Sequence, residues 1–334
     1  MGKTISDIAR IANVSKATVS RVINGKSQGV SKETAERIRR IIEQEGYLPN
    51  SLARSMVSAR TGTLGFVVPD IGNPFFSQIV RGIVRCASRR GYTVFLCNSD
   101  NDPELEGAFI QSMLEKRVDG LALISSDKSG KKTIAALKNQ DIPVVQVDRI
   151  VNPQDASVVI DNRTGMLMAA DYFLNKGADK IAFLAGTRGV YTTEQRLMGL
   201  KDALENRGRS LSDIWLDYGH YSVASGMEMA RRLLDAGTPV RAVLAGCDTI
   251  GIGVLRACRA RGVRVPEDLE VFGFDGISMA EVVDPVLSTV VQPIDELAEE
   301  SANLLIGMVE GTVTTKRHLV IEPRLLLRGT TLNG

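Results

Sequence analysis

The pattern of apolar and polar residues changes near residue 62, and this change divides the chain into two parts. Over residues 5–12, 16–24 and 32–45, apolar side chains recur every three to four positions, which predicts three short amphipathic helices. From residue 62 onward, short apolar runs alternate with longer amphipathic segments. This alternation of buried strands with helices is typical of parallel, doubly wound α/β sheets.

Capping residues mark the helix boundaries in the first part. Thr4 and Asp7 have the spacing of a capping box, and Ser15 and Ser31 are suitable N-cap residues for the second and third helices. Gly46 is suited to end the third helix because glycine adopts the left-handed C-cap conformation without a steric penalty. Two short helices joined by a tight turn and followed by a third helix predict a helix-turn-helix head.

The second part contains two successive arrays of strands and helices. The first array is predicted to have buried strands at 64–68, 93–97, 120–124, 143–147 and 157–160, with helices near 75–90, 103–117, 130–140 and 163–176. The second array has buried strands at 181–185, 214–218, 242–246 and 269–274, with helices near 193–207, 223–236 and 249–261. A strand at 288–291, a helix at 294–310 and a terminal strand pair at 318–328 complete the chain. We therefore predict two parallel doubly wound sheets.

Charge is distributed unevenly between the two parts. The chain of 334 residues has a formal net charge of +2. Residues 1–60 contain eleven Lys or Arg against five acidic residues, a balance of +6, whereas the remainder carries −4. This distribution indicates that contact with a polyanion is confined to the head, and a merely soluble basic segment is the alternative. A Ser/Gly/Thr linker places the boundary between head and body near residues 57–62.

The cysteines and the hydropathy pattern exclude several classes of protein. The four cysteines are Cys86, Cys97, Cys247 and Cys258, and none of them forms a CxxC pair or has zinc-ligand spacing. Cys97 and Cys247 lie at the ends of apolar runs and are expected to be buried free thiols. No apolar run approaches the ~18 residues that a membrane span requires, and no signal peptide is recognisable. We expect a cytoplasmic protein with no membrane partner, no metal and no cofactor.

The second predicted helix has the side-chain distribution of a DNA-reading helix. Its apolar residues Val19, Val22 and Ile23 cluster on one side of a helical wheel, and polar residues occupy the other. The amino-terminal residues of such a helix meet base edges, so Arg21 and Lys16 suit guanine acceptors and Ala17 suits a thymine methyl group. Phosphate contacts are expected from Thr18, Ser20, Asn24 and Tyr47. An ordinary helical bundle is the alternative, and the charge of the head favours DNA binding.

Polar and aromatic residues gather on loops that follow the predicted strands. Ligands of doubly wound sheets bind beyond the carboxyl ends of the strands, which selects the loops 69–76, 98–103, 125–130, 148–153, 186–196, 219–222, 246–249 and 275–277. The candidate ligand contacts are Phe75 and Phe76 for ring stacking, Arg149 and Arg196 for hydroxyls or carboxylates, Tyr221 as an aromatic wall, and Asp275 for paired hydroxyls. Asn73-Pro74 predicts a helix start that aims the two phenylalanines at the mouth of a cleft.

Several segments together resemble one known family. They are TISDIARIANVSKATVSRVING (4–25), GYLPNSLARSM (46–56), GFVVPDIGNPFF (65–76), VFGFDG (271–276), VVQP (290–293) and LLLRG (325–329). Over essentially the whole chain, this set resembles the LacI/GalR family of bacterial transcription regulators. The resemblance implies a homodimer, a palindromic operator of double-stranded DNA and a small effector held between two subdomains. It also implies that Lys16, Ala17 and Arg21 read bases, and that Thr192 and Arg196 of the TTEQR motif contact the effector.

The resemblance further implies a hinge helix that forms when two protomers sit on DNA. The positions that match the family's PNxxARxL pattern are Pro49, Asn50, Ala53, Arg54 and Met56. In the family a leucine wedges into the central base step of the minor groove, and Met56 stands at its position here. Methionine is a workable apolar wedge, although it is flexible and loses more rotamer freedom on insertion. A plain linker role for Met56 is the alternative.

The implied organisation is a small all-α head joined by a hinge helix to a periplasmic-binding-protein-like body. The expected domains are the head (1–48), the hinge (49–61) and the body (62–334), whose amino-terminal subdomain comprises 62–161 and 292–322 and whose carboxy-terminal subdomain comprises 162–291 and 323–334. Several arginines near the cleft favour a sugar or sugar acid over a purine as the effector. Whether the effector releases or strengthens operator binding stays open.

Two other functions were compared with this one. An enzyme is disfavoured because no GxxxxGK[ST] or GxGxxG motif follows a strand, and because His220 and His318 have no nucleophile signature beside them. An extracellular solute-binding protein would share the body, but the basic head and the absence of an export signal argue against it. No leucine heptad follows residue 328, so a tetramer formed by a terminal coiled coil is not expected.

Overall fold

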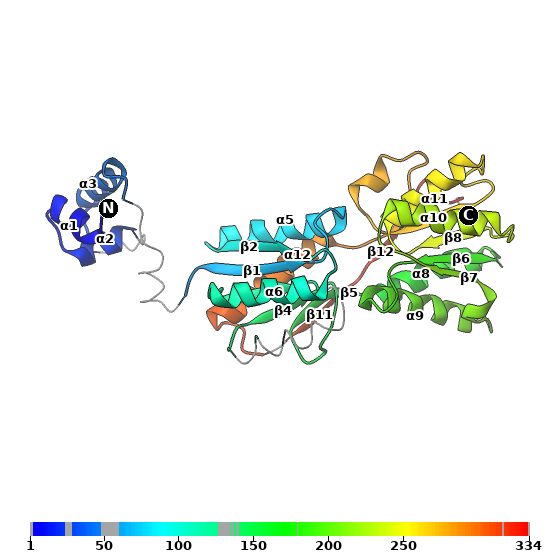
Figure 1. Ribbon diagram of the computed structural model, residues 1–334, viewed down its shortest axis with the longest axis horizontal. Helices are drawn as coiled ribbons and strands as arrows, with labels where there is room; N and C mark the ends of the chain where they lie inside the picture. The colour runs from blue at the N-terminus through cyan, green and yellow to red at the C-terminus, as the bar shows by residue number, and fades with distance from the viewer. Residues whose placement is uncertain are drawn as a thin grey trace. The chain divides into compact units, whose positions relative to one another are not determined.

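A computed structural model of the chain divides into two compact units, residues 1–61 and 62–334, which are described separately below (Figure 1). It describes residues 3–23, 29–47, 60–125, 134, 137, 140–178, 180–315 and 317–332. The helix predicted at 130–140 lies largely outside these residues. The segment predicted to form the hinge also lies outside them, except for its last two residues, 60 and 61.

The three predicted helices of the head are confirmed. They are α1 (Ile5–Ile11), α2 (Lys16–Ile23) and α3 (Lys32–Gln44). The capping box between Thr4 and Asp7 is present, and Ser15 Oγ accepts a hydrogen bond from the Thr18 backbone N–H at 3.1 Å. Gly46 follows α3 with a φ of +59°, as the C-cap prediction requires. The core of the head consists of Ile8, Ala9, Ala12, Val19, Val22, Ala35, Ile38 and Tyr47.

The body contains, within its described residues, two six-stranded sheets with parallel pairing except at one edge. Sheet A has the order β11-β5-β4-β3-β1-β2, formed by β1 (Thr63–Val68), β2 (Thr93–Asn98), β3 (Gly120–Leu123), β4 (Val144–Val147), β5 (Ser157–Ile160) and β11 (His318–Ile321). Sheet B has the order β12-β10-β9-β8-β6-β7, formed by β6 (Ile181–Ala185), β7 (Trp215–Tyr218), β8 (Ala242–Ala245), β9 (Glu270–Asp275), β10 (Ser288–Val291) and β12 (Arg324–Leu326). The predicted pair of doubly wound sheets is therefore confirmed.

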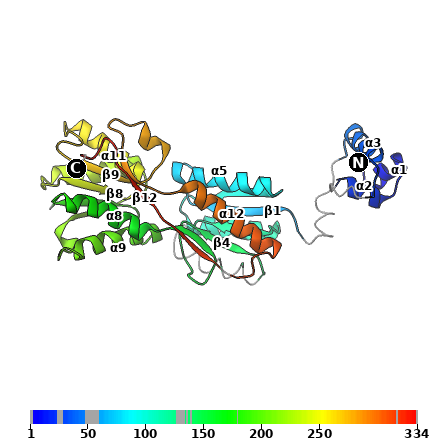
Figure 2. The ribbon, with the colours of Figure 1, turned by 180° about the vertical axis from the view of Figure 1, so that it is seen from behind.

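Helices cover both faces of each sheet (Figures 1 and 2). The helices are α5 (Pro74–Arg89), α6 (Pro103–Glu115), α8 (Asn162–Asn175), α9 (Tyr191–Glu205), α10 (Val223–Asp235), α11 (Asp248–Ala260) and α12 (Ile294–Glu310), with short 3₁₀ turns at Leu211–Asp213 and Ser278–Glu281. Alternation along β1 shows how the layers form: Leu64 and Phe66 share a core with α5 and α12, whereas Val67 packs with Met113 of α6. In sheet B, α8 and α9 cover one face while α10 and α11 cover the other.

Two predictions about strands are wrong. The edge strands β2 and β7 are only partly buried, and Phe95 and Leu96 of β2 are 41% and 36% exposed, because no described strand covers their outer edges. Cys97 on β2 is accordingly half-buried, whereas Cys247 is buried as expected. The terminal strands do not pair with each other: β11 joins sheet A beside β5, and β12 joins sheet B antiparallel to β10. Pro323 separates the two strands, so the chain passes from one sheet to the other there.

A glycine permits the close crossing of α8 and α9. Gly199 lies in the middle of α9, and a Cβ added to it would overlap the carbonyl oxygen of Arg163 on α8. The missing side chain therefore sets how deeply α9 sits on α8. This matters for the cleft described below, because the first two turns of α9 face it.

Replacement of Gly199 by Ala is expected to lower the free energy of unfolding by about 1–3 kcal/mol, because the added methyl group overpacks a backbone contact. Urea unfolding of the full chain measures this change. Gly107 on α6 is a matched control, since a Cβ there meets nothing within 4 Å. Gly107→Ala should be neutral or stabilising by up to about 1 kcal/mol. Equal effects of the two substitutions would show that α9 is not seated by this contact.

Candidate functional site

Strand ends of both sheets meet at one cleft in the body. Its innermost space, here called the inner pocket, is lined by Asn73, Phe75, Phe76, Asp148, Arg149, Thr192, Arg196, Tyr221, Cys247 and Asp275. All seven residues predicted to contact an effector are in this set. The inner pocket holds about 20 Å³, enough for one water molecule, and it adjoins a wider outer pocket of about 750 Å³. The structure therefore brings the predicted residues together, although a sugar ring in contact with all of them requires movement of the walls.

The two sides of the outer pocket carry different charged residues. The loops that follow strands of sheet A contribute the carboxylates of Asp70 and Asp100, and the loop after β6 contributes the guanidinium of Arg188. Phe76, Arg149 and Tyr221 line both pockets, so the two spaces share walls. A ligand in the outer pocket therefore lies beside three residues of the inner pocket.

Both carboxylates of the inner pocket stand on unusual backbone. Asp148 follows β4 with a φ of +63°, and Asp275 ends β9 with a φ of +128°. Backbone of this kind costs on the order of 1–3 kcal/mol for a residue other than glycine and is found mostly at functional sites. The side chains are nevertheless buried, with exposed fractions of 2% and 5%. The strain and the burial together indicate that these carboxylates are held in place for a ligand.

Arg196 is anchored by four contacts. Its Nε donates to Asn162 Oδ1 at 2.8 Å, and its Nη1 donates to the carbonyl oxygen of Gly246. Its Nη2 lies 3.6 Å from Asp275 Oδ1, and the guanidinium lies 3.7 Å from the centre of the Phe274 ring. These contacts leave the guanidinium little freedom, so Arg196 presents a fixed positive charge that the Asp275 carboxylate balances.

Arg149 and Asp148 form a second buried pair that is less completely bonded. Arg149 Nη1 donates to the Ser125 carbonyl oxygen at 2.9 Å, and the guanidinium lies 5.3 Å from the centre of the Phe76 ring. Arg149 Nε is 3.7 Å from Asp148 Oδ2, which is an ion pair but not a hydrogen bond. In the part of the chain that the structure describes, Asp148 Oδ1, Arg149 Nε and Gln292 Oε1 are buried without a hydrogen-bond partner, as is Trp215 Nε1 on β7 away from the cleft. Buried polar atoms normally have partners, so Asp148 Oδ1 and Arg149 Nε, whose residues line the inner pocket, are candidates for bonds to a ligand.

Tyr221 is a rigid aromatic wall. Its hydroxyl lies 3.1 Å from Thr192 Oγ1 and 2.5 Å from Thr193 Oγ1, in the first turn of α9. Its ring covers Gly186, where a Cβ would collide with the ring atoms. A fixed ring of this kind suits the apolar face of a flat ligand, because little rotamer entropy is lost when the ligand binds.

Asp248 supports the loop that carries Asp275 from behind. Its Oδ2 accepts from the backbone N–H groups of Gly276 and Ile277 at 2.8 and 2.9 Å, and its Oδ1 accepts from Thr289 Oγ1 at 2.5 Å. Burial raises the pKa of the Asp248 carboxyl to about 7 in spite of these bonds. Burial also raises the pKa of Asp275, which the nearby Arg196 charge opposes, and that of Asp148, which Arg149 opposes. Two of these buried acids therefore lie beside buried arginines, and Asp248 lies behind the loop that carries Asp275.

Sequence reasoning missed several residues of this site. Asp148, Gln292, Asn162, Cys247 and Asp248 were not predicted as contacts or supports. Asp148 directly follows a predicted strand and precedes Arg149, so the rule of strand ends contained the signal that would have found it. Asn162 and Gln292 lie where the chain passes between the sheets, which only the tertiary structure shows. Asn73 caps α5 as predicted, with Oδ1 accepting from the Phe75 backbone N–H at 3.0 Å.

Cys247 is poorly suited to nucleophilic chemistry. Burial raises the pKa of its thiol to about 12, so the thiolate is scarce at neutral pH. Among the described residues, no group of three or more His, Cys, Asp or Glu side chains is placed to hold a metal ion. No helix of the described chain is long and apolar enough to cross a bilayer.

The head presents the predicted base-reading residues on the surface of α2. Lys16, Ala17 and Arg21 are exposed, while Thr18 and Ser20 are partly buried. Tyr47 is only 8% exposed and packs in the core of the head, so its ring is structural and a phosphate contact by its hydroxyl stays a prediction. The remaining predicted DNA contacts, Asn24, Asn50, Ala53 and Met56, lie outside the described residues.

A helix-turn-helix head followed by two doubly wound sheets around a polar cleft defines a class of ligand-responsive DNA-binding proteins. Residues 4–50 match the model of the bacterial regulatory proteins of the lacI family, and residues 170–331 match the model of the periplasmic binding protein-like domain. The ribose operon repressor of Halalkalibacterium halodurans is 35% identical over 331 residues, with 99% of this chain and 98% of the relative covered. This chain belongs to the lacI family of bacterial regulatory proteins.

Solved structures agree with this assignment. The lac repressor dimer bound to operator and the anti-inducer ONPF is similar with a TM-score of 0.90 at 26% identity, with all of both chains covered. The complex of the transcriptional regulator CelR with cellobiose is similar with a TM-score of 0.74 at 33% identity, covering 98% of this chain and 99% of the other.

The three buried acids predict an unusual dependence of stability on pH. Burial raises the pKa of all three, and that of Asp248 to about 7, so between about pH 4 and pH 7 Asp248 binds more protons in the folded chain than in the unfolded chain, where its pKa is about 3.9. Their contribution to stability is therefore present at acidic pH and is lost as the pH rises through the raised values. Asp248→Asn should reduce the loss of unfolding free energy between pH 5 and pH 8, as measured by urea unfolding.

Asp268 provides the matched control for this measurement. It is an exposed carboxylate whose pKa is lowered to about 2 by the hydrogen bonds from Arg264, so its charge does not change between pH 5 and pH 8. Asp268→Asn should therefore leave the pH difference unchanged. A difference that is the same in the wild type and in Asp248→Asn would show that Asp248 is ionised throughout this range.

Proposed function

We propose that this protein is a transcription regulator, most simply a repressor, that binds a palindromic operator as a homodimer and responds to a sugar in the cleft. The observation that carries the effector site is the convergence of Asp148, Arg149, Arg196, Tyr221 and Asp275 on one buried space that still contains unpartnered polar atoms. The family membership supports a regulator rather than an enzyme. Because its target is chromosomal DNA, we place the protein in the cytoplasm.

The charges of the inner pocket favour an uncharged sugar over a sugar acid. Arg196 is balanced by Asp275 at 3.6 Å, and Arg149 is balanced by Asp148 at 3.7 Å. A ligand carboxylate would add a negative charge beside two buried aspartates, and no arginine there lacks an acidic neighbour. Hydroxyl groups, in contrast, can donate to the carboxylates and accept from the guanidinium groups without adding charge. The CelR structure, which contains cellobiose, is a relative with a ligand of this class.

The geometry of the head supports direct reading of the operator. Arg21, Lys16 and Ala17 are exposed along α2, whose opposite face is buried by Val19 and Val22. In our proposal α2 enters the major groove and the partner's α2 enters the next one, roughly 34–36 Å away. The predicted hinge contacts of Asn50, Ala53 and Met56 with the minor groove belong to the same proposal.

Apolar residues on the edge of sheet A support dimerisation. Leu96 on β2 and Val84 on α5 are 36% and 39% exposed, although each belongs to an apolar pattern in the sequence, whereas Phe95, which is 41% exposed, points to the opposite face of the strand. Exposed apolar patches on a soluble domain mark interaction sites. We propose that this face of β2 and α5 packs against the same face of a second copy.

The cleft and the dimer face together provide a means of regulation. The chain passes between the two sheets near residues 161, 292 and 322, so a ligand that contacts both sheets changes the angle between them. That angle sets the separation of the two hinges in the dimer. The separation in turn determines the free energy of ordering the hinges on DNA. The coupling between the two sites is expected to be about 1–3 kcal/mol, with either sign.

Asp275→Ala is expected to abolish the response of operator binding to the effector. Removal of this carboxylate leaves Arg196 without its balancing charge and removes an acceptor for ligand hydroxyls. Fluorescence anisotropy with a selected operator, in a titration with sugars that stabilise the wild type in a thermal-shift screen, measures the response. A ligand at a hundred times its dissociation constant adds about 2.7 kcal/mol, which such a screen detects.

Asp295→Ala serves as the control for this experiment. Asp295 is 84% exposed on α12 and pairs with Arg85 on the surface, so its loss should not change the response. Operator affinity without sugar should be close to that of the wild type in both variants. An unchanged sugar titration in Asp275→Ala would refute the assignment of the cleft.

Arg21→Ala is expected to weaken operator binding by roughly 1–3 kcal/mol and to relax the preference at one base position. The physical reason is the loss of a bidentate contact between the guanidinium and a guanine. Affinities for a set of single-base operator variants measure the change. Arg10→Ala is a control, because Arg10 lies on α1, is 78% exposed and pairs with Asp7. Unchanged selectivity in Arg21→Ala would show that this side chain does not read bases.

A further inference from the structure

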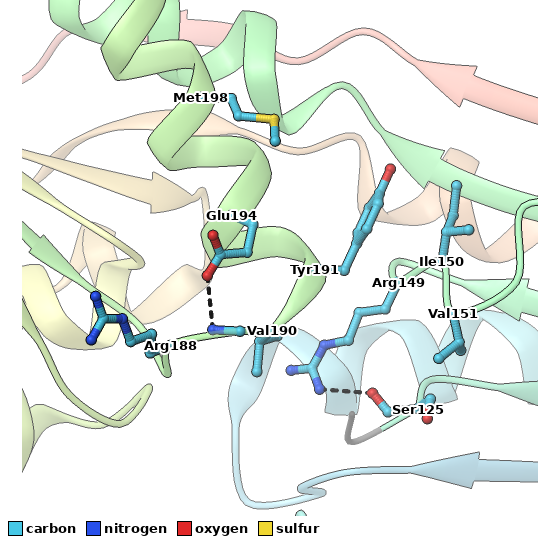
Figure 3. A pocket seen from close by; sticks show the side chains of 10 residues that line it. Ser125, Arg149, Ile150, Val151, Arg188, Val190, Tyr191, Glu194 and Met198 are labelled. Atoms are coloured by element: carbon cyan, nitrogen blue, oxygen red, sulfur yellow. Dashed lines mark hydrogen bonds between the residues drawn. The ribbon is translucent and has the colours of Figure 1, made fainter. Parts of the chain in front are cut away.

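Helix α9 presents two different faces to the cleft. Thr192 and Arg196, four residues apart, line the inner pocket. Tyr191, Glu194 and Met198 have the spacing i, i+3 and i+7, so they form a separate stripe along the same helix. This second stripe lines another space of about 420 Å³, here called the side pocket, together with the loop that follows β4 (Figure 3). The effector site described above makes no use of this stripe.

The side pocket adjoins the effector site. Arg149 lines the inner, outer and side pockets, and the segment 188–190 lines both the outer and the side pockets. Figure 3 shows Arg149 between Tyr191 and Ser125, with Ile150 and Val151 on the side opposite Glu194. A group attached to a ligand in the effector site can therefore extend past Arg149 into the side pocket.

The charged residues of the side pocket already make contacts within the protein, although Arg149 Nε has no hydrogen-bond partner. Glu194 Oε1 accepts from the Gly189 backbone N–H at 2.8 Å, and Arg149 is held by Ser125 and Asp148. The Arg188 guanidinium lies 5.0 Å from the centre of the Tyr218 ring, which belongs to β7. These contacts reduce the capacity of the side pocket to bind additional hydroxyl groups.

The apolar residues of the side pocket, in contrast, are open to a ligand. Met198 is 45% exposed, which is unusual for a large apolar side chain. Its side chain lines the side pocket. Ile150, Val151 and Tyr191 supply the other apolar walls. Methionine adapts its shape to irregular apolar partners, and an aromatic ring supplies a flat surface for stacking. The lining is therefore better suited to an apolar group than to a second sugar ring.

We propose that the side pocket binds the apolar aglycone of a glycoside whose sugar ring occupies the inner and outer pockets. This inference rests on the proposed function, because the sugar places the aglycone. It narrows the effector from sugars in general to alkyl or aryl glycosides. Since Ile150 and Val151 follow sheet A while Tyr191 and Met198 belong to the layer on sheet B, the aglycone contacts both sides of the cleft and contributes to the angle between them.

Binding of matched glycosides to the full-length protein tests the proposal. The probes are D-ribose, D-glucose and D-galactose, each as the free sugar, the methyl glycoside and the phenyl glycoside in both anomeric forms. Isothermal titration calorimetry should show that, for the sugar that binds, one phenyl glycoside binds roughly tenfold or more tightly than the corresponding methyl glycoside. The gain arises because the phenyl group buries apolar surface that the methyl group does not.

Two substitutions connect this gain to the side pocket. Met198→Gln keeps a good helix former at an exposed position and should remove most of the phenyl gain while leaving the affinity for the free sugar unchanged. Tyr191→Ala should have the same effect through a different wall of the pocket. Met279→Gln is the matched control, because Met279 is 40% exposed outside the cleft, and it should leave the ratio of phenyl to methyl affinity unchanged.

The outcomes separate this inference from the function on which it rests. Equal binding of methyl and phenyl glycosides, or a phenyl gain that survives both Met198→Gln and Tyr191→Ala, overturns the side pocket but leaves a sugar effector in place. Failure of every probe to bind the wild type overturns the sugar assignment, and the aglycone site with it. Removal of the gain by both cleft variants, with the Met279→Gln ratio intact, supports the proposal.

Discussion

Two buried ion pairs at the junction of the sheets are the constraint on which the cleft depends. Asp148 with Arg149 comes from the sheet A side of the cleft, and Arg196 with Asp275 comes from the sheet B side. All four side chains are at most 5% exposed. A buried pair is weak evidence for stability, since the cost of removing two charges from water often exceeds their attraction. Apolar residues would fill this space at less cost. The pairs are therefore better explained by recognition of a polar ligand than by folding.

The rest of the body compensates for that cost. Asp148 directly follows β4 and Asp275 is the last residue of β9, and both have strained backbone. The residues of these two strands are almost all buried, so each strand holds the adjoining carboxylate in place. Asp248 adds hydrogen bonds to the loop after β9, and Thr192 and Thr193 hold the Tyr221 hydroxyl. Preorganisation of this kind lowers the entropy lost when a ligand binds. Regular, well-packed sheets thus support a site that is locally unfavourable.

Much of this architecture is visible in the order of residues. Short continuous apolar runs identified the strands and apolar residues with a period of 3.6 identified the helices, because a strand inside a doubly wound sheet is buried on both faces and a helix on one. Thr4, Ser31 and Asn73 marked helix starts through hydrogen bonds that their own side chains make to the next turn. The effector residues were found because strand ends meet in a parallel sheet and because the residues there are polar or aromatic. These properties depend on neighbours within a few positions or on a general rule of topology.

Other features depend on residues far apart in the chain. The apolar run on β2 is no different in sequence from that on β1, yet β2 lies at an edge and its side chains are exposed, because sheet order is decided by the packing of all the layers. The strands β11 and β12 are close in sequence but join different sheets. Burial of Asp148 and Asp248, and the approach of Gln292 to Asp275, likewise arise only after folding. The local pattern determined the helices and strands, the helix caps and most of the polar residues of the cleft. Long-range packing decided which of these polar side chains are buried, which are paired, and which have an atom without a hydrogen-bond partner.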